Sequence, residues 1–202
     1  MERSLEANVV RLCGALAGKP AWSHETRGQG FYLFPLEVRR LSGNTDTLPI
    51  VVRQELLESL ALQDACRILV QGQLRSFNDH RGTGPRLVIS VFAQDLAFSD
   101  EEDQDLVLLS GSLCRPPVLR RTPLGREICD LMLAVPRHYG RSDYLPCICW
   151  GLNARRAAGW ATGQKLCLEG RLQSRAYLKQ TPEGPQQRTA YEVSVNEIEA
   201  ES

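Results

Sequence analysis

Residues 144–151, which read YLPCICWG, decide the fold of this chain. Side chains on a β-strand point alternately to its two faces, so this segment has two different sides. One side is apolar enough to face a core and is formed by Leu145, Cys147 and Cys149. The other side is formed by Tyr144, Ile148 and Trp150. Two of these are large aromatic side chains with no evident burial partner.

A second segment, residues 168–177 (LEGRLQSRAY), shows the same alternation. Apolar and small side chains share one parity, namely Leu166, Leu168, Gly170 and Leu172. The opposite parity is basic and aromatic and comprises Glu169, Arg171, Gln173, Arg175 and Tyr177. Flat rings for bases and cations for phosphates are what single-stranded nucleic acid requires. An isolated aromatic is as often an ordinary core residue, but the shared parity of two strands favours a binding surface.

Length and composition describe a folded chain without a membrane span. The chain has 202 residues, of which 43% are hydrophobic and 24% charged, enough for a packed core in one large or two small domains. No run of ~18 apolar residues could cross a membrane. The first ten residues (MERSLEANVV) lack a charged region followed by an apolar one, so we expect no secretory signal. The expected location is the cytoplasm, in association with the nucleoid.

The seven cysteines are an odd number and lie mostly within apolar strand patterns. No Cys-x2-Cys spacing occurs, and only three histidines could complete a metal site. We therefore expect reduced core thiols, and neither a metal nor another cofactor.

The net charge of zero conceals an asymmetry along the chain. Residues 1–99 hold 11 basic and 10 acidic residues, residues 100–105 hold five acids and no base, and residues 106–202 hold 13 basic and 9 acidic residues. The positive charge thus lies in the same half as the aromatic face. A nucleic-acid footprint would be local rather than spread over the whole protein.

The chain repeats itself after about 97 residues. The motif Leu-x-Gly-x-Leu occurs at 12–16 and 109–113, and Asp-x-Leu-Pro occurs at 46–49 and 143–146. Apolar residues alternate up to an arginine at 34–40 and at 131–137, and the motif ending in Gly-x-Leu-x-Ser at 70–76 recurs at 168–174. Such a nearly constant shift, with one residue inserted before the last block, predicts two copies of one fold. We divide the chain into residues 1–98, an acidic linker at 99–105, and residues 106–202.

Each copy is expected to contain five strands with a short helix between the third and the fourth. In the first copy the strands are predicted near 8–16, 31–40, 47–53, 67–75 and 86–93, and in the second near 107–113, 126–135, 144–150, 165–173 and 188–198. The helices are predicted at 54–64 and 152–161. A turn at 122–125, and hairpins at 82–85 and 183–185, are predicted from Pro and Gly. This order is that of the OB-fold, so the predicted class is all-β with two tandem OB-folds, which are five-stranded Greek-key barrels.

The second copy resembles the bacterial single-stranded DNA-binding protein family. The residues that carry this resemblance are Gly111, Thr122-Pro123-x-Gly125, Leu133-Ala134-Val135-x-Arg137, Pro146, Trp150-Gly151 and Glu169-Gly170-Arg171-Leu172-Gln173-x-Arg175-x-Tyr177. The resemblance covers about 90 residues. It implies binding of single-stranded DNA without strong sequence preference, in replication, recombination and repair. A stacking surface accepts RNA as well, so the sequence leaves both nucleic acids open.

By the same resemblance, bases would stack on aromatic residues of the second copy. These are Trp150, Tyr144, Tyr177 and Tyr139. Phosphates would be bound by Arg137, Arg141, Arg171, Arg175, Lys179 and Arg188. For Tyr139 and Arg141 the alternative is an ordinary solvated loop tip.

The first copy lacks these residues at the equivalent positions. Trp150 corresponds to Arg53, Tyr144 to Thr47 and Tyr177 to Asp79. Phe77 and Arg75 share the outward face of its fourth strand and are candidates for a residual contact. We therefore expect a degenerate OB-fold used for packing, dimerisation or a protein contact. Because the tandem form resembles family members that assemble as dimers to present four barrels, we expect a homodimer.

Two further expectations concern the linker and the C-terminus. The acidic linker is predicted to be a solvated connector. The chain stops at Ser202 without the glycine-rich tail and acidic tip typical of the family, so we do not expect tail-mediated recruitment of repair enzymes.

Two other classes of function compete with DNA binding. The first is an adaptor related to the primosomal OB proteins, in which protein contacts dominate. The second is an enzyme, which the sequence disfavours because it offers no nucleophile–base constellation, phosphate loop or paired carboxylates.

Overall fold

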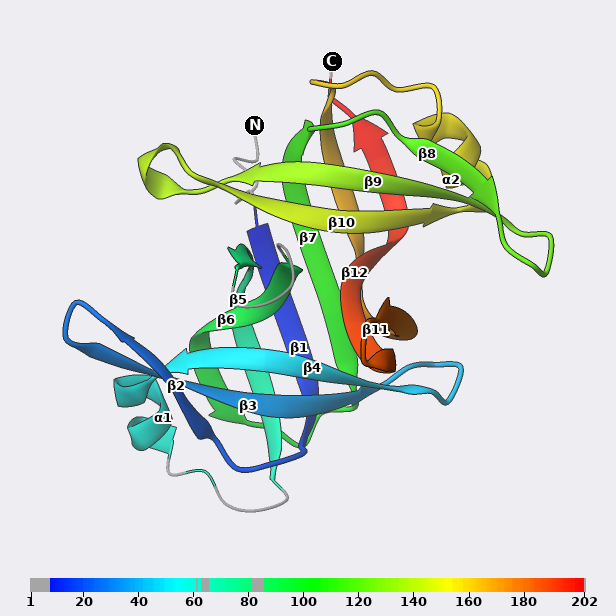
Figure 1. The fold of residues 1–202 in the computed structure, drawn as a ribbon. Coiled ribbons are helices and arrows are strands. Elements are labelled where there is room, and N and C mark those ends of the chain that lie inside the picture. Colours follow the sequence, from blue (N-terminus) through cyan, green and yellow to red (C-terminus); the bar gives the residue numbers. More distant parts are fainter. Residues whose placement is uncertain (1–7, 61, 63–65, 81–85, 202) are drawn as a thin grey trace.

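Two similar five-stranded barrels lie one above the other in the computed structural model, which describes residues 8–60, 62, 66–80 and 86–201 (Figure 1). The first barrel contains β1 (Asn8–Leu16), β2 (Ala21–Thr26), β3 (Gln29–Arg39), β4 (Thr45–Arg53), α1 (Gln54–Leu60), β5 (Arg67–Asp79) and β6 (Arg86–Phe98). The second contains β7 (Gln104–Leu113), β8 (Val118–Arg121), β9 (Glu127–Pro136), the 3-10 turn η1 (His138–Gly140), β10 (Ser142–Trp150), α2 (Gly151–Ala157), β11 (Lys165–Thr181) and β12 (Gly184–Ala200). No helix in the described ranges is both long and apolar enough to span a bilayer.

Both barrels close in the same order. In the first, β1 pairs with β3 and β5, β3 with β4, and β5 with β6, and the parallel pair β4–β6 completes the ring. In the second, β7, β9, β10, β12 and β11 pair in the corresponding way. The additional strands β2 and β8 lie outside these five-stranded rings and pair with β3 and β9. The short helices α1 and α2 each follow the third strand of their barrel. The predicted tandem OB-fold, with its repeat, is confirmed.

Strands β1 and β7 join the two barrels into one sheet (Figure 1). They pair antiparallel, with Asn8 opposite Leu109 and Leu12 opposite Asp105. In the repeat Asn8 corresponds to Asp105 and Leu12 to Leu109, so this register relates the barrels by a local twofold axis. By this symmetry, a residue of the first barrel that lies against the second barrel has an equivalent in the second barrel that lies against the first.

The repeated glycines are required by close backbone approach at the bulge of each barrel. Gly72 and Gly170 lie where the pairing of β5 with β6 and of β11 with β12 shifts by one residue. A Cβ atom on Gly72 would lie 2.1 Å from the carbonyl oxygen of Phe92, and one on Gly170 would lie 2.4 Å from that of Ser194. Only glycine fits there, because the bulge brings the two backbones together.

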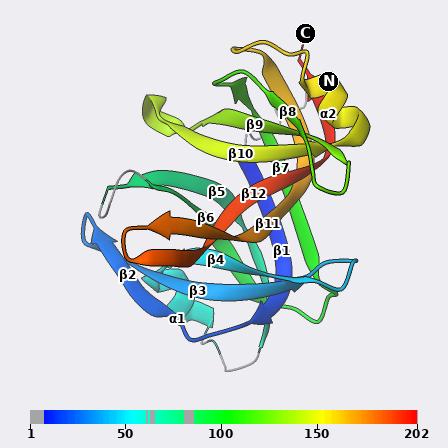
Figure 2. The same cartoon turned by 45° about the vertical axis from the view of Figure 1, so that its right-hand side comes forward.

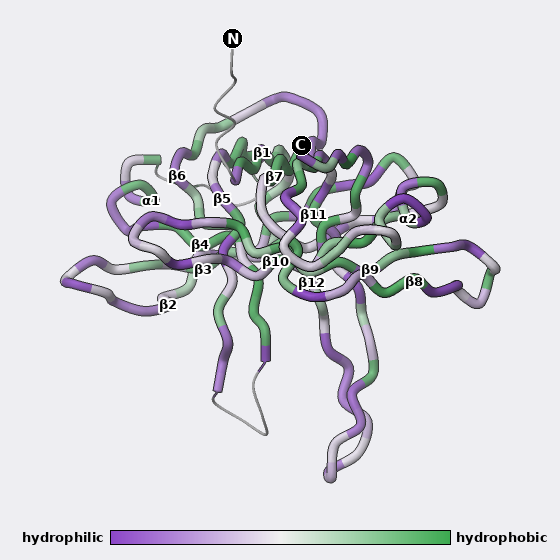
Figure 3. Tube along the Cα trace, turned by 90° about the horizontal axis from the view of Figure 1, so that it is seen from above, coloured by the Kyte–Doolittle hydropathy of each residue, from purple (hydrophilic) through white to green (hydrophobic). Residues whose placement is uncertain are grey.

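The hairpins β5–β6 and β11–β12 project from the same side of the molecule (Figure 3). Strand β11 continues to Thr181, eight residues beyond its predicted end, and β12 begins at Gly184 instead of residue 188. The extension was missed because its side chains leave the core, so the apolar alternation stops while backbone pairing continues. The turn predicted at 183–185 joins the two strands, whereas the one at 82–85 lies outside the described residues.

The sequence analysis also missed β2 and β8. Every residue of both strands is exposed, so neither shows the alternation that marks a half-buried strand. The turn predicted at 122–125 is confirmed and joins β8 to β9, where Gly125 N–H donates to the Thr122 carbonyl at 2.8 Å. The helices end earlier than predicted, at Leu60 and Ala157, and of the predicted helix at 54–64 residues 61 and 63–65 lie outside the described residues.

The acidic linker is exposed to solvent at residues 100–102, as predicted, but it is more than a connector because two of its carboxylates bind the first barrel. Glu101 pairs with Arg11 at 2.9 Å, and Asp103 pairs with Arg67 at 2.6 Å and accepts the Arg39 N–H at 2.5 Å. Strand β7 already begins at Gln104. The pairing of β1 with β5 brings Arg11 and Arg67 to one edge of the first barrel, a proximity that the sequence does not show. The segment is therefore bound to that barrel.

Candidate nucleic-acid interface

A groove of about 690 Å³ crosses the face of the second barrel. We call it the second-barrel groove, and it is lined by Arg40, Arg126, Trp150, Asn153, Arg171, Gln173, Ser174, Arg175, Ser194, Val195 and Asn196. Four of these residues are arginines and none is acidic. A groove lined by arginine and free of carboxylate attracts a polyanion.

Trp150 lies at the end of β10, where the chain turns into α2 at Gly151. Gly151 has a φ of 54°, which a residue with a side chain rarely adopts. The indole Nε1–H donates to Ser194 Oγ at 3.1 Å, which fixes the ring, while 37% of the residue remains exposed. The prediction that Trp150 faces outward while Leu145, Cys147 and Cys149 face the core is confirmed, although Ile148 is buried. A fixed, partly exposed ring is suited to stack against a base.

Residues of β11 extend the basic surface from the groove onto the projecting hairpin. The Arg175 guanidinium lies 5.9 Å from the centre of the Tyr177 ring, and its Nε is 3.7 Å from Glu192. Tyr177 faces Arg188 across the hairpin, and Lys179 faces Gln186. In Figure 2 this hairpin passes in front of the first barrel. Tyr177, Lys179 and Arg188 thus form an arm next to the groove.

The other predicted residues lie at the opposite end of β10. Tyr144 is 48% exposed and six residues from Trp150, which corresponds to about 20 Å along a strand. Beyond it, the β9–β10 loop presents Arg141 and the fully exposed Tyr139, whose φ is 65°. The predicted residues therefore do not converge on one pocket and are distributed along an extended surface.

Arg137 is engaged in an ion pair rather than directed freely at solvent. Its Nε donates to Asp143 at 2.5 Å, its Nη2 also contacts Asp143, and Nη2 donates to the Ser76 carbonyl of the first barrel at 3.3 Å. Asp143 is fully buried and also accepts the Ser76 N–H at 2.6 Å and Arg75 Nη1 at 3.1 Å. We call this cluster the Asp143 joint.

The repeat places an equivalent cluster, the Asp46 joint, on the other side. Asp46 accepts Arg40 Nε and Nη2, each at 2.5 Å, and from the second barrel the Ser174 N–H at 2.7 Å and Oγ–H at 2.8 Å. Burial opposes ionisation of Asp46, but the bonds from Arg40 and Ser174 outweigh it and lower the pKa of this carboxyl. In each joint, a buried aspartate that is paired with an arginine of its own barrel binds a strand of the other barrel. Asp143 binds β5, and Asp46 binds β11. Sequence reasoning missed this, because the partners are separated by 67 and 128 residues.

Asp105 lies beside the Asp46 joint. Its Oδ1 accepts the Leu172 N–H at 2.9 Å, while burial, opposed by this bond, raises the pKa of its carboxyl to about 7. Its counterpart Asn8 accepts the Leu74 N–H and also donates to the Leu74 carbonyl, both at 2.8 Å. A neutral side chain therefore satisfies this position more fully than a carboxylate does.

The first barrel has a groove of its own, with a volume of about 550 Å³. It is lined by Ser23, His24, Thr26, Phe31, Val51, Arg75, Ser76, Phe77, Ser90, Phe92 and Arg137. The His24 and Phe31 rings are stacked at 4.8 Å, and the Arg53 guanidinium lies 5.5 Å from the centre of Phe92. Arg53 and Phe92 occupy the positions of Trp150 and Ser194 in the second barrel, so the aromatic ring has moved to the neighbouring strand.

Of this surface the sequence indicated only Phe77 and Arg75, which both line the groove, and it did not indicate Phe31 and Phe92, because positions were carried across the repeat one by one. Arg53, Thr47 and Asp79 are indeed not aromatic. The signal that could have revealed the surface is parity: Phe31 and Phe92 alternate with the core residues of β3 and β6, as Trp150 does on β10.

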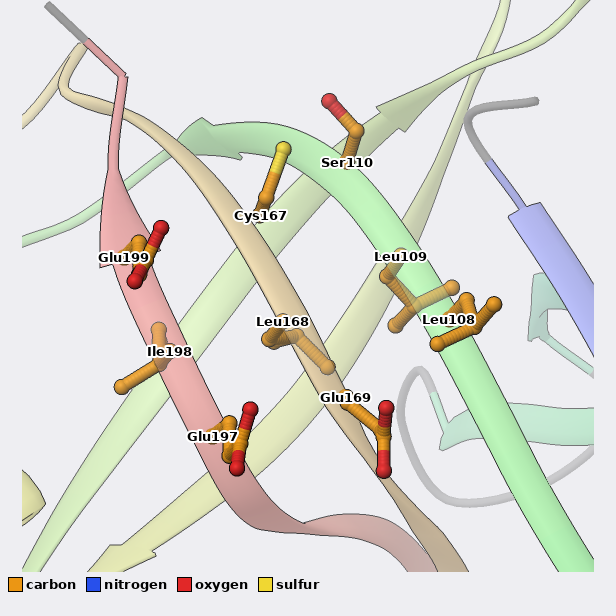
Figure 4. Close-up of a pocket in the computed structure, with 9 residues that line it drawn as sticks. All are labelled: Leu108, Leu109, Ser110, Cys167, Leu168, Glu169, Glu197, Ile198 and Glu199. Carbon is orange, nitrogen blue, oxygen red and sulfur yellow. The ribbon is translucent and has the colours of Figure 1, made fainter. Parts of the chain in front are cut away.

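A third, smaller hollow of about 170 Å³ lies on the outer face of β7, β11 and β12 (Figure 4). Glu169, Glu197 and Glu199 line it together with Cys167 and Ser110. Three carboxylates would repel a phosphate chain, so this face does not suit nucleic acid.

Comparison with known proteins points to one family. Residues 105–200 match the model of the single-strand binding protein family. Over 103 residues, 48% of this chain, it is 32% identical to single-stranded DNA-binding protein A of Bacillus subtilis, covering 55% of that protein. It is 33% identical over 78 residues to the single-stranded DNA-binding protein of Halalkalibacterium halodurans, covering 35% of this chain and 46% of that protein. The chain thus spans about half the length of the curated relatives it matches.

The fold of the whole chain has a solved counterpart. The wild-type single-stranded DNA binding protein from Thermus aquaticus superposes with a TM-score of 0.79 at 22% identity, over 96% of this chain and 93% of that one. This likeness concerns the fold and includes both barrels. Residues 105–200, which form the second barrel, thus match the single-strand binding protein family, and the likeness of the whole chain to the solved structure is one of fold.

Proposed function

We propose that this protein binds single-stranded DNA without strong sequence preference, by stacking bases on exposed aromatic rings and contacting phosphates with arginines. The second-barrel groove carries this proposal, because it combines four arginines, no carboxylate and the fixed Trp150 ring. The names of the family and of its curated relatives agree with it. In this proposal the protein is not an enzyme and acts on DNA in the bacterial cytoplasm.

The predicted residues take different parts in this proposal. Trp150, Arg171 and Arg175 line the groove itself. Tyr177, Lys179 and Arg188 extend it along the hairpin, and Tyr144, Tyr139 and Arg141 extend it at the other end of β10. Arg137, whose charge is matched by Asp143, acts mainly as part of the joint between the barrels.

The first-barrel groove favours a second contact with the same strand. Its lining residues include aromatic rings and no carboxylate, and its two arginines, Arg75 and Arg137, share the single charge of Asp143 and so retain a net positive charge. We therefore propose that the first barrel is a nucleic-acid-binding repeat with rearranged aromatics rather than a purely structural one. This replaces the expectation drawn from the sequence.

Single strands are expected to bind, and duplexes are not, because stacking requires unpaired bases. The test is fluorescence anisotropy with matched DNA, RNA and duplex oligonucleotides at two salt concentrations. Affinity for the single strand should fall as salt rises, since bound arginines release counterions. Equal affinity for the duplex would contradict the stacking mechanism, and absence of binding would favour the protein-adaptor alternative.

Trp150→Ala is expected to weaken binding of an oligo-dT strand by about 1–3 kcal/mol, the value of one base–aromatic stack. Trp160→Phe provides the matched control, because Trp160 packs against the core and does not line the groove. Anisotropy of a labelled oligonucleotide measures both variants without depending on tryptophan emission. Equal affinities for the two variants would remove Trp150 from the site.

We also propose that the protein forms a homodimer, which would present four barrels. Surface is available outside both grooves, for example the outer face of β7, β11 and β12, so a dimer formed through such surface would leave both grooves open. Analytical ultracentrifugation should show twice the chain mass of 22.6 kDa. A monomer at all concentrations would contradict this proposal.

A further inference from the structure

The second-barrel groove contains a residue of the first barrel. Arg40 follows β3 in the first barrel, yet it lines the groove together with Trp150 and Arg171. Its two bonds to Asp46 and the bond from its Nη2 to the Ser174 carbonyl, at 3.2 Å, hold its guanidinium across the joint. A side chain fixed in this way loses little rotamer freedom when it binds a ligand.

Arg171 lies on the second-barrel side of the same joint. Its Nη1 is 3.8 Å from Asp46 Oδ2, but this buried nitrogen has no hydrogen-bond partner among the described residues. Burial, followed by the nearby charge of Arg40, lowers the pKa of Arg171. Two arginines therefore share the single carboxylate of Asp46, which leaves one positive charge in excess, and the buried Nη1 of Arg171 lacks a hydrogen-bond partner among the described residues.

We propose that Arg40 and Arg171 jointly hold one phosphate of the bound strand where it passes the joint between the barrels. This inference rests on the proposed function and assigns the first barrel a direct contact in the second-barrel groove. The planar guanidinium offers paired donors that match phosphate oxygens. Asp46 does not line the groove, because it is 1% exposed behind the two arginines.

The other joint is built differently. Gln73 occupies the position of Arg171 there and accepts a bond from Arg75 at 2.5 Å. Arg75 and Arg137 both donate hydrogen bonds to Asp143, which is a shared acceptor for the two guanidinium groups. Within the described residues, the combination of paired arginines and an unused donor therefore belongs to the Asp46 joint.

Arg40→Ala is expected to weaken binding of oligo-dT about tenfold at low salt and to reduce the slope of log affinity against log salt by about 0.7, the value of one phosphate contact on a single strand. The matched control is Arg39→Ala, which removes the same charge from the neighbouring residue outside the groove. Both variants are measured by anisotropy in the full chain. An effect of Arg40→Ala no larger than that of Arg39→Ala, with an unchanged slope, would overturn the inference.

Arg40→Ala also leaves Asp46 without its main partner, so Arg40→Gln is measured beside it, because its amide still donates to a carboxylate. The same reduction in slope is expected, since the charge is lost in both. If folded Arg40→Gln had the same slope of log affinity against log salt as the wild-type protein, Arg40 would serve to hold the barrels together, and the phosphate contact would be rejected. Failure of the wild-type chain to bind oligo-dT would instead reject the proposed function itself.

Discussion

Asp143→Ala is expected to lower the free energy of unfolding by about 3 kcal/mol, the lower end of the range for breaking a buried ion pair. The carboxylate is fully buried and accepts bonds from Arg75, Arg137 and the Ser76 N–H. Its removal leaves two arginines without a counter-ion and a buried amide without an acceptor. Because these donors come from both barrels, the loss also loosens the joint between them. Urea unfolding followed by circular dichroism measures the change.

Asp130→Ala is the matched control for this substitution. Asp130 pairs with Arg120 at 2.5 Å, but the pair is partly exposed and lies within one barrel. Exposed pairs contribute roughly 0–1 kcal/mol. If Asp143→Ala destabilised the protein no more than Asp130→Ala, the Asp143 joint would not hold the barrels together.

Asp105→Asn is expected to stabilise the protein at pH 8 by about 2 kcal/mol. The pKa of the Asp105 carboxyl in the folded protein is about 7, well above its ordinary value of 3.8, so the folded protein disfavours the ionised carboxyl. Three pKa units correspond to ~4 kcal/mol, of which we expect half because the side chain is partly exposed. Asn8 shows that an amide fits the equivalent site with two hydrogen bonds.

The pH dependence has a defined sign. Below about pH 4 the Asp105 carboxyl is protonated in both the folded and the unfolded state, so it does not lower the free energy of unfolding. As the pH rises from about 4 to about 7, the unfolded chain loses this proton while the folded chain keeps it, so stability falls; above that range the cost is constant. Unfolding at pH 5 and pH 8 should show that Asp105→Asn removes this part of the slope. The charged groups that face Asp105 are Asp46, Arg40 and Arg171. If stability changed with pH equally in the wild-type protein and in Asp105→Asn, the pH dependence would come from these groups instead.

The converse substitution tests the same argument in the first barrel. Asn8→Asp would place a carboxyl next to Leu74, at the position equivalent to Asp105, and should destabilise the protein most above pH 7. A stability change independent of pH would mean that lost packing, rather than ionisation, governs this position.

The features that could be predicted from the sequence are those that produce a periodic pattern in it. Alternation in β10 revealed the core residues Leu145, Cys147 and Cys149 and the outward Trp150, and the shift of about 97 residues revealed the second barrel. Burial also raises the pKa of the Cys147 and Cys149 thiols, in agreement with core cysteines. The same method failed for β2 and β8, because fully exposed strands have no apolar face.

The joints and the composite groove could not be predicted from the sequence. Asp46 and Ser174, or Asp143 and Ser76, meet only because β1 pairs with β7 and turns each barrel towards the other. Arg137, which was predicted as a phosphate contact, is bound to Asp143 in the Asp143 joint and also lines the first-barrel groove. Arg40 was not singled out as a binding residue, although it lines the second-barrel groove.

The central claim is that a single strand follows the groove across Trp150 and the arm formed by β11 and β12. Photo-cross-linking of the full chain to an oligo-dT strand containing 5-iododeoxyuridine, with the adducts mapped by mass spectrometry, tests this claim most directly. We predict adducts at Trp150 and Tyr177, and at Phe31 or Phe77 when the oligonucleotide is long enough to reach the first barrel. Adducts confined to residues outside both grooves and the arm would contradict the account.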